Sequence, residues 1–136
     1  MTALVDTGFL LAMLAHNDPQ HEACKAVMQQ ESNPLIPSSV LPELAYMIIR
    51  DLGYPILVKF MEEVTGPRSP IVFIEATDLS RATELINQYA DTHIDFVDCT
   101  IVAIAERLGI ATIFTIDQRH FRILRPKHCD YFDILP

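Results

Sequence analysis

The sequence predicts an α/β domain in which a mainly parallel β-sheet is covered by helices on both faces. Segments with strand character alternate with segments of helical periodicity along the whole chain, and this alternation is typical of parallel sheets. The 136 residues are 50% hydrophobic and 21% charged, a composition that suits one globular core. Because no repeat or long linker divides the chain, residues 1–136 are expected to form a single domain.

The first half of the chain begins with a strand and continues through helices that carry clear start and stop signals. Asp18 is expected to cap a helix that has Pro19 at its first position. Ser39 is expected to cap a later helix that tolerates Pro42 in its first turn and ends at Gly53. The expected elements are a strand at 2–6, a strand and turn at 35–39, and helices at 9–14, 19–32, 43–52 and 54–64.

The second half follows the same alternation after a clear loop at 66–70, which reads GPRSP. A strongly apolar helix in this half is expected to close at Gly109. The expected elements are strands at 71–76, 111–115 and 131–135, and helices at 79–91 and 95–109.

Cysteine usage and the apolar runs indicate a cytoplasmic chain without a membrane anchor. The three cysteines are an odd number at spacings that suit no disulfide framework, which favours a reducing compartment. No run reaches the roughly 18 apolar residues of a membrane span, and no secretory leader is recognisable at the N-terminus.

The net charge of −8 argues against nucleic-acid binding as a default, because the phosphate backbone favours basic proteins. The basic residues are nevertheless unevenly distributed. Four of the ten fall within nine consecutive positions, and they form either a solvated basic turn or a surface that faces phosphates: Arg119, Arg122, Arg125 and Lys127.

Acidic residues stand where two predicted strands end and where two predicted helices begin. Asp6 ends the first strand, and Asp117 follows the strand at 111–115 by one residue. Ligands of open parallel sheets bind outside the carboxyl ends of the strands. Glu43 and Asp98 lie in first turns of helices, so all four carboxylates can reach one edge of the sheet.

Helix capping is the simpler explanation for some of these acids. Asp95 is best explained as an N-cap, with Asp98 completing a box-like cap three residues later. For Asp98 and Glu43, capping alone and a role in a site are equally good interpretations. Carboxylates that converge need a cation to offset their repulsion, and oxygen ligands suit Mg²⁺ or Mn²⁺. One or two such ions would favour phosphodiester hydrolysis.

Other reaction classes fit the sequence less well. The triplet Asp6-Thr7-Gly8 resembles an aspartic protease motif, but those proteins are all-β and glycine-rich, whereas this chain has long helical patterns and only four glycines. A haloacid-dehalogenase-like phosphatase would require a second Asp at position 8. A cysteine nucleophile at Cys99, paired with His93 or His120, and a zinc site at His128 and Cys129 lack supporting spacing.

The four acids in their contexts resemble the motifs of PIN domains, specifically the toxin ribonucleases of bacterial VapBC toxin–antitoxin pairs. The similar segments span the chain and read ALVDTGFLLAML, SSVLPELAYMI, IDFVDCTIVAIAERLG and TIFTIDQRHFRILRP. The resemblance implies that metal is bound by Asp6, Glu43, Asp98 and Asp117. It also implies that residues beside the site orient water or carboxylates, namely Thr7, Thr115 and Asp95.

The same resemblance implies a three-layer α/β/α sandwich with a short sheet, a homodimer, and RNA cleavage that depends on Mg²⁺ or Mn²⁺. It further implies an antitoxin whose tail covers the cleft. The apolar faces of 9–14 and 44–49 would then be either partner surface or core. Two other functions remain open on this fold: a nuclease for RNA processing or for DNA without a toxin role, and a non-catalytic module that binds RNA or a protein.

Overall fold

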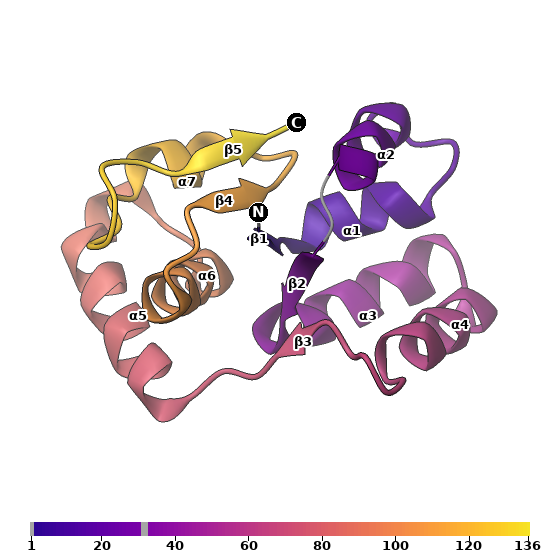
Figure 1. The fold of residues 1–136 in the computed structure, drawn as a ribbon, viewed down its shortest axis with the longest axis horizontal. Coiled ribbons are helices and arrows are strands. Elements are labelled where there is room, and N and C mark those ends of the chain that lie inside the picture. Colours follow the sequence, from indigo (N-terminus) through magenta and orange to yellow (C-terminus); the bar gives the residue numbers. More distant parts are fainter. Residues whose placement is uncertain (1, 31–32) are drawn as a thin grey trace.

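The computed structural model describes residues 2–30 and 33–136, and its centre is a five-stranded sheet (Figure 1). The strand order is β3-β2-β1-β4-β5, and every neighbouring pair is parallel. All carboxyl ends therefore lie at one edge of the sheet. The strands are β1 (Thr2–Val5), β2 (Asn33–Pro37), β3 (Ile71–Val72), β4 (Thr112–Phe114) and β5 (Asp133–Leu135).

Helices cover the sheet on both sides, as expected for an α/β/α sandwich. Helices α1 to α4 lie on one side of the strands, and α5 and α6 lie on the other (Figure 1). The helices are α1 (Thr7–Leu14), α2 (His21–Gln30), α3 (Leu41–Asp51), α4 (Tyr54–Val64), α5 (Ala76–Gln88), α6 (Phe96–Leu108) and α7 (Arg119–Ile123). Two short 3₁₀ helices are η1 (Ser38–Val40) and η2 (Ala90–Thr92). None of the helices in the described ranges is long and apolar enough to cross a membrane.

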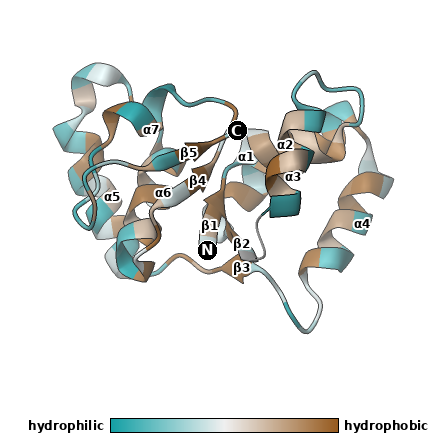
Figure 2. Cartoon of the chain, turned by 45° about the horizontal axis from the view of Figure 1, so that its top comes forward, coloured by the Kyte–Doolittle hydropathy of each residue, from teal (hydrophilic) through white to brown (hydrophobic). Residues whose placement is uncertain are grey.

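The core forms where the two central strands meet α1 and α6. Strands β1 and β4 are buried almost completely, and the rings of Phe9 and Phe114 pack with their centroids 5.2 Å apart. Figure 2 shows hydrophobic residues on the central strands and hydrophilic residues on the outer helices and turns. Helix α6 buries a continuous run, 99–105, which accounts for its strongly apolar sequence.

The two apolar faces that were candidates for partner surface belong mainly to this core. Phe9 and Leu10 of α1 and Leu44 and Ile48 of α3 are buried within the chain itself. Tyr46, on the other side of α3, is exposed. The core interpretation therefore holds for these buried side chains, whereas Tyr46 and the half-buried residues of both segments remain accessible to a partner.

Several predicted boundaries are wrong because local hydrogen bonds decide where helices begin. Helix α2 begins at His21 and not at Pro19, because Asp18 closes a turn in which its Oδ1 accepts from the Gln20 amide at 2.7 Å. Its predicted end at 31–32 lies outside the described residues. Ser39 does not cap α3, since its hydroxyl lies 2.8 Å from Thr100 Oγ1 and is hydrogen-bonded to it.

The strand expected at 71–76 is only two residues long, because a capping box starts α5 early. Glu75 is the N-cap, and its own amide donates to Asp78 Oδ2 at 2.9 Å. The last strand is also shorter than expected and begins at Asp133. Helix α7 was not predicted, since its five residues are too few to establish a helical period. The expected closure of α6 at Gly109 is confirmed, with a left-handed φ of 69°.

Asp78 anchors α5 to the end of α6 and gives the first testable prediction. Its carboxylate is 2% exposed and is 2.9 Å from Arg107 Nη2. Asp78→Ala should lower the free energy of unfolding by about 2–4 kcal/mol, because the capping box and the more buried of the two acidic partners of Arg107 are both lost. Urea unfolding would measure this effect, with exposed Asp91→Ala as the matched control. Equal midpoints for the two variants would contradict the assignment.

Candidate active site

A cavity of about 250 Å³ opens at the carboxyl edge of the sheet, between the ends of β1 and β4 and the start of α6. We call it the acidic cavity, because carboxylates from four separate segments line it. These are Asp6, Glu43, Asp98 and Asp117, and the structure thus brings all four sequence candidates together. The other lining residues are Thr7, Gly8, Asp95, Val97, Ile116 and His120.

Asp6 is held rigidly where β1 turns into α1. It is the N-cap of α1, and its Oδ1 accepts from the Phe9 amide at 2.9 Å. Its own amide donates to Phe114 O at 3.1 Å and so continues the pairing with β4. Thr115 Oγ1 donates to Asp6 Oδ2. The strand end and the helix start therefore fix both oxygens of this carboxylate.

Thr115 links Asp6 to Asp117, which lies in the segment after the neighbouring strand β4. Its hydroxyl donates to Asp6 and accepts from the Asp117 amide at 3.1 Å. The Asp117 carboxylate is paired with Arg119, whose Nε and Nη2 lie 3.1 and 3.2 Å from its two oxygens. Thr115 is fully buried, whereas the Arg119 side chain is 82% exposed. The threonine is thus a fixed part of the site and the arginine is a solvent-facing partner.

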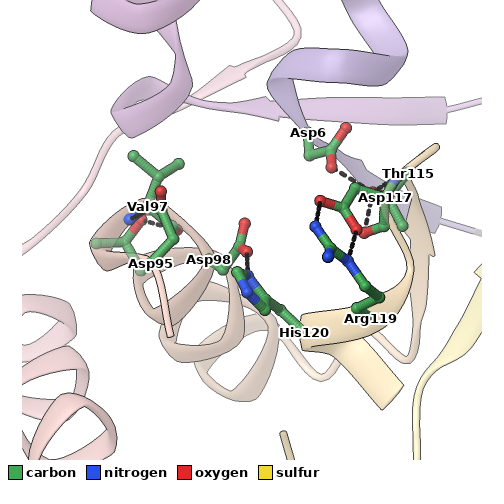
Figure 3. Close-up of polar contacts among 9 residues, drawn as sticks. Asp6, Asp95, Val97, Asp98, Thr115, Asp117, Arg119 and His120 are labelled. Atoms are coloured by element: carbon green, nitrogen blue, oxygen red, sulfur yellow. Dashed lines mark hydrogen bonds and ion pairs between the residues drawn. The ribbon is translucent and has the colours of Figure 1, made fainter. Parts of the chain in front are cut away.

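Asp98 lies on the opposite wall, in the first turn of α6, and faces His120 (Figure 3). Its Oδ2 is 2.6 Å from His120 Nδ1. The prediction that Asp98 completes a box-like cap is wrong, because its side chain bonds His120 of α7 and no group of its own helix. Asp95 alone caps α6, accepting from the Val97 amide at 2.6 Å.

The electrostatics of the acidic cavity follow from burial and from repulsion between carboxylates. The pKa of Asp6 is raised to about 7: burial is the largest cause, repulsion from Asp98 and Asp117 acts in the same direction, and the hydrogen bonds from Thr115 and Phe9 oppose the change. Burial likewise raises the pKa of Asp98 to about 6, against the opposing effect of His120. Arg119 lowers the pKa of Asp117. Two of the carboxylates are thus held in surroundings that disfavour their charged forms.

The cavity suits a cation with oxygen ligands, although its carboxylates do not converge on one point. Within residues 2–30 and 33–136, no three acidic, histidine or cysteine side chains form a complete ligand set. The reason is visible in Figure 3, where Asp98 turns to His120 and Asp117 turns to Arg119. Thr7 Oγ1 is buried without a hydrogen-bond partner. An unsatisfied polar oxygen beside crowded carboxylates fits a bound hydrated cation.

Gly8 leaves space that a larger residue would remove. A Cβ at this position would lie 3.1 Å from Ile116 Cγ1 and 3.9 Å from Asp6 Oδ1. That first distance is tighter than ordinary van der Waals contact. The Asp-Thr-Gly triplet therefore serves the close approach of the β1–α1 turn to the segment after β4.

In the part of the chain that the structure describes, neither a nucleophile at Cys99 nor a zinc site at His128 and Cys129 is supported. Cys99 is fully buried in α6, and burial raises the pKa of its thiol to about 11. Such a thiol is part of the hydrophobic core and is not an activated nucleophile. His128 Nε2 is hydrogen-bonded to Ile110 O at 2.6 Å, and Cys129 lies 3.7 Å from the same ring. All three cysteines are free.

Comparison with known proteins identifies the class to which this fold and cavity belong. The PIN domain family model matches residues 3–125. The chain is therefore a member of the PIN domain family, as the motif resemblance implied.

Individual proteins are similar to the chain over almost its full length. The chain is 28% identical over 134 residues to Ribonuclease VapC26 of Mycobacterium tuberculosis, covering 98% of this chain and 99% of the relative. Among solved structures it is similar to M. tuberculosis VapC20, a sarcin-ricin loop cleaving toxin, with a TM-score of 0.84, 19% identity and coverage of 98% and 99%. It is also similar to VapBC2 from Rickettsia felis, bound to promoter DNA, with a TM-score of 0.69, 18% identity and coverage of 98% and 97%. These two structures support the fold.

His120 is the lining residue that sequence reasoning did not assign to the carboxylate cluster. Its imidazole contacts Asp98, 22 positions earlier in the chain. The available signal was the sequence Arg-His-Phe directly after Asp117 and Gln118. Phe121 is buried and anchors α7, so its neighbour His120 is held against the start of α6.

Proposed function

We propose that this chain is a divalent-metal-dependent endoribonuclease and the toxin of a type II toxin–antitoxin pair. The observation that carries the proposal is the acidic cavity, which is lined by four carboxylates from the β1–α1 turn, α3, α6 and the segment after β4. Support also comes from a relative that covers nearly the whole chain and is named as a ribonuclease. A structural neighbour is described as a toxin that cleaves the sarcin-ricin loop.

The proposed metal ligands are the four carboxylates Asp6, Glu43, Asp98 and Asp117. Mg²⁺ or Mn²⁺, as one or two ions, would polarise the scissile phosphate and activate water there. Thr115 holds Asp6 in one orientation, which reduces the freedom that a ligand must lose on binding. Asp6, whose pKa burial and neighbouring carboxylates raise to about 7, would be held in its ionised form by the charge of a bound cation.

Of the two basic side chains beside the carboxylates, one would change its partner when the site is filled and the other would keep it. Arg119 is exposed and pairs with Asp117 by a surface ion pair, an interaction that the surrounding water weakens. It can therefore release Asp117 at little cost and turn to a substrate phosphate. His120 would remain against Asp98 and orient it through Nδ1.

We further propose that the chain acts in the cytoplasm, forms a homodimer and binds a protein antitoxin. Several structural relatives are VapBC complexes, including those of Haemophilus influenzae and Salmonella typhimurium. The neighbouring reading frame gives an inexpensive test of the toxin role. A small protein with a DNA-binding N-terminal region would support it, and its absence would favour a nuclease for RNA processing or for DNA.

A metal titration tests the catalytic proposal. Purified protein stripped with EDTA should leave single-stranded RNA intact, and Mg²⁺ or Mn²⁺ should restore cleavage to a plateau. DNA of the same sequence should be cut far more slowly. Cleavage that persists in EDTA would contradict the metal requirement. No cleavage at any metal concentration, with RNA binding retained, would favour the non-catalytic module.

A further inference from the structure

The basic segment 119–127 is not one surface, because its four cationic side chains face three different places. Arg119 pairs with Asp117 at the acidic cavity. Lys127 faces α5 and α6, with Nζ 3.9 Å from Glu84 and its amide bonded to Glu106 at 2.8 Å. Arg122 and Arg125 instead line a second cavity.

We call this second space the arginine cavity. It measures about 410 Å³ and lies where α7 meets β5 and the residues before it, which are neighbours in Figure 1. Tyr131 lines it and is 71% exposed. The buried rings of Phe121 and Phe132 pack edge to face beneath, with centroids 6.2 Å apart. The cavity thus has a rigid aromatic floor and a free aromatic face.

The arginines are already oriented by local hydrogen bonds. Arg122 Nη2 donates to Gln118 Oε1 at 2.6 Å, and Arg125 Nη1 donates to Arg122 O at 2.7 Å. Gln118 is held in turn through Nε2, which donates to Pro136 O at 2.6 Å. Asp130 is the acidic residue of the lining, so two arginines and one carboxylate leave one net positive charge. That charge matches the single negative charge of a phosphodiester.

The two cavities are adjacent along the chain. Asp117 lines the acidic cavity and Gln118, the next residue, lines the arginine cavity. Helix α7 then carries His120 to the first and Arg122 to the second. An RNA strand that runs from the acidic cavity along α7 would therefore meet first the guanidinium groups of the arginine cavity and then the exposed ring of Tyr131.

We propose, building on the function proposed above, that the arginine cavity binds a nucleotide of single-stranded RNA beside the scissile phosphate. Arg122 and Arg125 contact its phosphates, since guanidinium groups match phosphate geometry. Tyr131 stacks on an unpaired base, the mode by which proteins hold single strands. The subsite positions substrate and takes no part in the bond cleavage itself.

A fluorescence experiment tests the stacking directly, because the chain contains no tryptophan. Tyr131→Trp introduces one fluorophore into the cavity, and Asp6→Asn in the same chain prevents cleavage in Mg²⁺ buffer. Single-stranded oligoadenylate should quench this fluorescence. Phe73→Trp is the matched control. Phe73 is also 71% exposed, but it lies beside the end of α6 and not in the arginine cavity, since its carbonyl accepts a hydrogen bond from Arg107 in the last turn of that helix. Quenching in the control alone, or in neither variant, overturns the proposal.

Binding measurements separate the arginines from the rest of the basic segment. Tyr131→Ala should weaken oligoadenylate binding about tenfold, and Arg122→Ala should lower the slope of log affinity against log salt by about one. Lys127→Ala should change neither. Equal effects of Arg122→Ala and Lys127→Ala overturn the subsite, as does equal quenching of Tyr131→Trp by duplex RNA, because a paired base cannot stack on the ring.

The subsite and the proposed function can fail separately. Tyr131→Ala in the otherwise unchanged chain should raise the KM for RNA cleavage with kcat nearly constant, as expected for a positioning residue. If the unchanged chain cleaves RNA and Tyr131→Ala has the same KM, the subsite is overturned and the nuclease stands. If the unchanged chain cleaves no RNA at any Mg²⁺ or Mn²⁺ concentration, the proposed function fails.

Discussion

Asp6→Asn should reduce RNA cleavage at saturating Mg²⁺ by about a thousandfold or more, while leaving the fold intact. The substitution keeps the size of the side chain and its ability to accept from the Phe9 amide. It removes the negative charge from the most deeply buried of the four carboxylates, which is 8% exposed. Loss of one electrostatic contact in a water-poor site typically costs about 10²–10³ in rate, and a metal ligand should cost at least as much.

The measurement is single-turnover cleavage of a labelled RNA, with circular dichroism to check the fold. Asp91→Asn is the matched control, since Asp91 is an exposed acid of η2, outside the lining of the acidic cavity. It should cleave at the wild-type rate. Equal activity of Asp6→Asn and the unchanged chain would mean that the acidic cavity is not the catalytic site.

The same substitution should stabilise the metal-free protein at pH 8. Burial raises the pKa of Asp6 from 3.8 to about 7. Below about pH 4 the carboxyl is protonated in both folded and unfolded states, and the folded state bears no penalty. Between pH 4 and 7 only the folded state retains the proton, so the free energy of unfolding falls as pH rises. Above pH 7 the full penalty is present.

The expected gain for Asp6→Asn at pH 8 in EDTA is on the order of 4 kcal/mol, since the pKa is raised from 3.8 to about 7 and each unit of pKa shift corresponds to about 1.4 kcal/mol. This corresponds to a rise in Tm of roughly 15 °C. The raised pKa of Asp98, about 6, adds a smaller loss of wild-type stability over the lower part of the same range. Thermal unfolding from pH 4 to pH 8 would measure the difference between the two proteins.

Added Mg²⁺ distinguishes this explanation from a general packing effect. The unchanged chain should gain stability with Mg²⁺ concentration, because ligand binding to the folded state adds to its stability. Asp6→Asn should respond far less. A variant that is less stable than the unchanged chain at pH 8, or a wild type with flat stability between pH 4 and 7, would contradict the burial of an ionised Asp6.

Together these results would indicate that the arrangement of the acidic cavity lowers the stability of the folded, metal-free protein. Thr115 and the α1 N-terminus keep Asp6 in place although burial disfavours its charge. Functional sites commonly carry such a cost. Thr7, with a buried hydroxyl that lacks a partner, adds to it.

The sequence by itself determined most of the secondary structure and the identity of the acidic residues that line the cavity. Alternation of strands and helices, the Asp95 cap and the Gly109 stop are local signals, and each depends on residues within a few positions. Asp6 and Asp117 could be predicted to lie at the same edge of the sheet, because the carboxyl ends of parallel strands share that edge. Helix α7 escaped prediction because its five residues contain no complete period.

Only the tertiary structure decided how the acidic residues are paired and what lies beside them. The bond from Thr115 to Asp6 joins residues 109 positions apart, and that from His120 to Asp98 joins residues 22 apart. Burial, which raises the pKa of Asp6, and the arginine cavity likewise arise from segments that meet only on folding. Local sequence sets which groups are available, but their distances and surroundings are set by how the sheet and its helices pack.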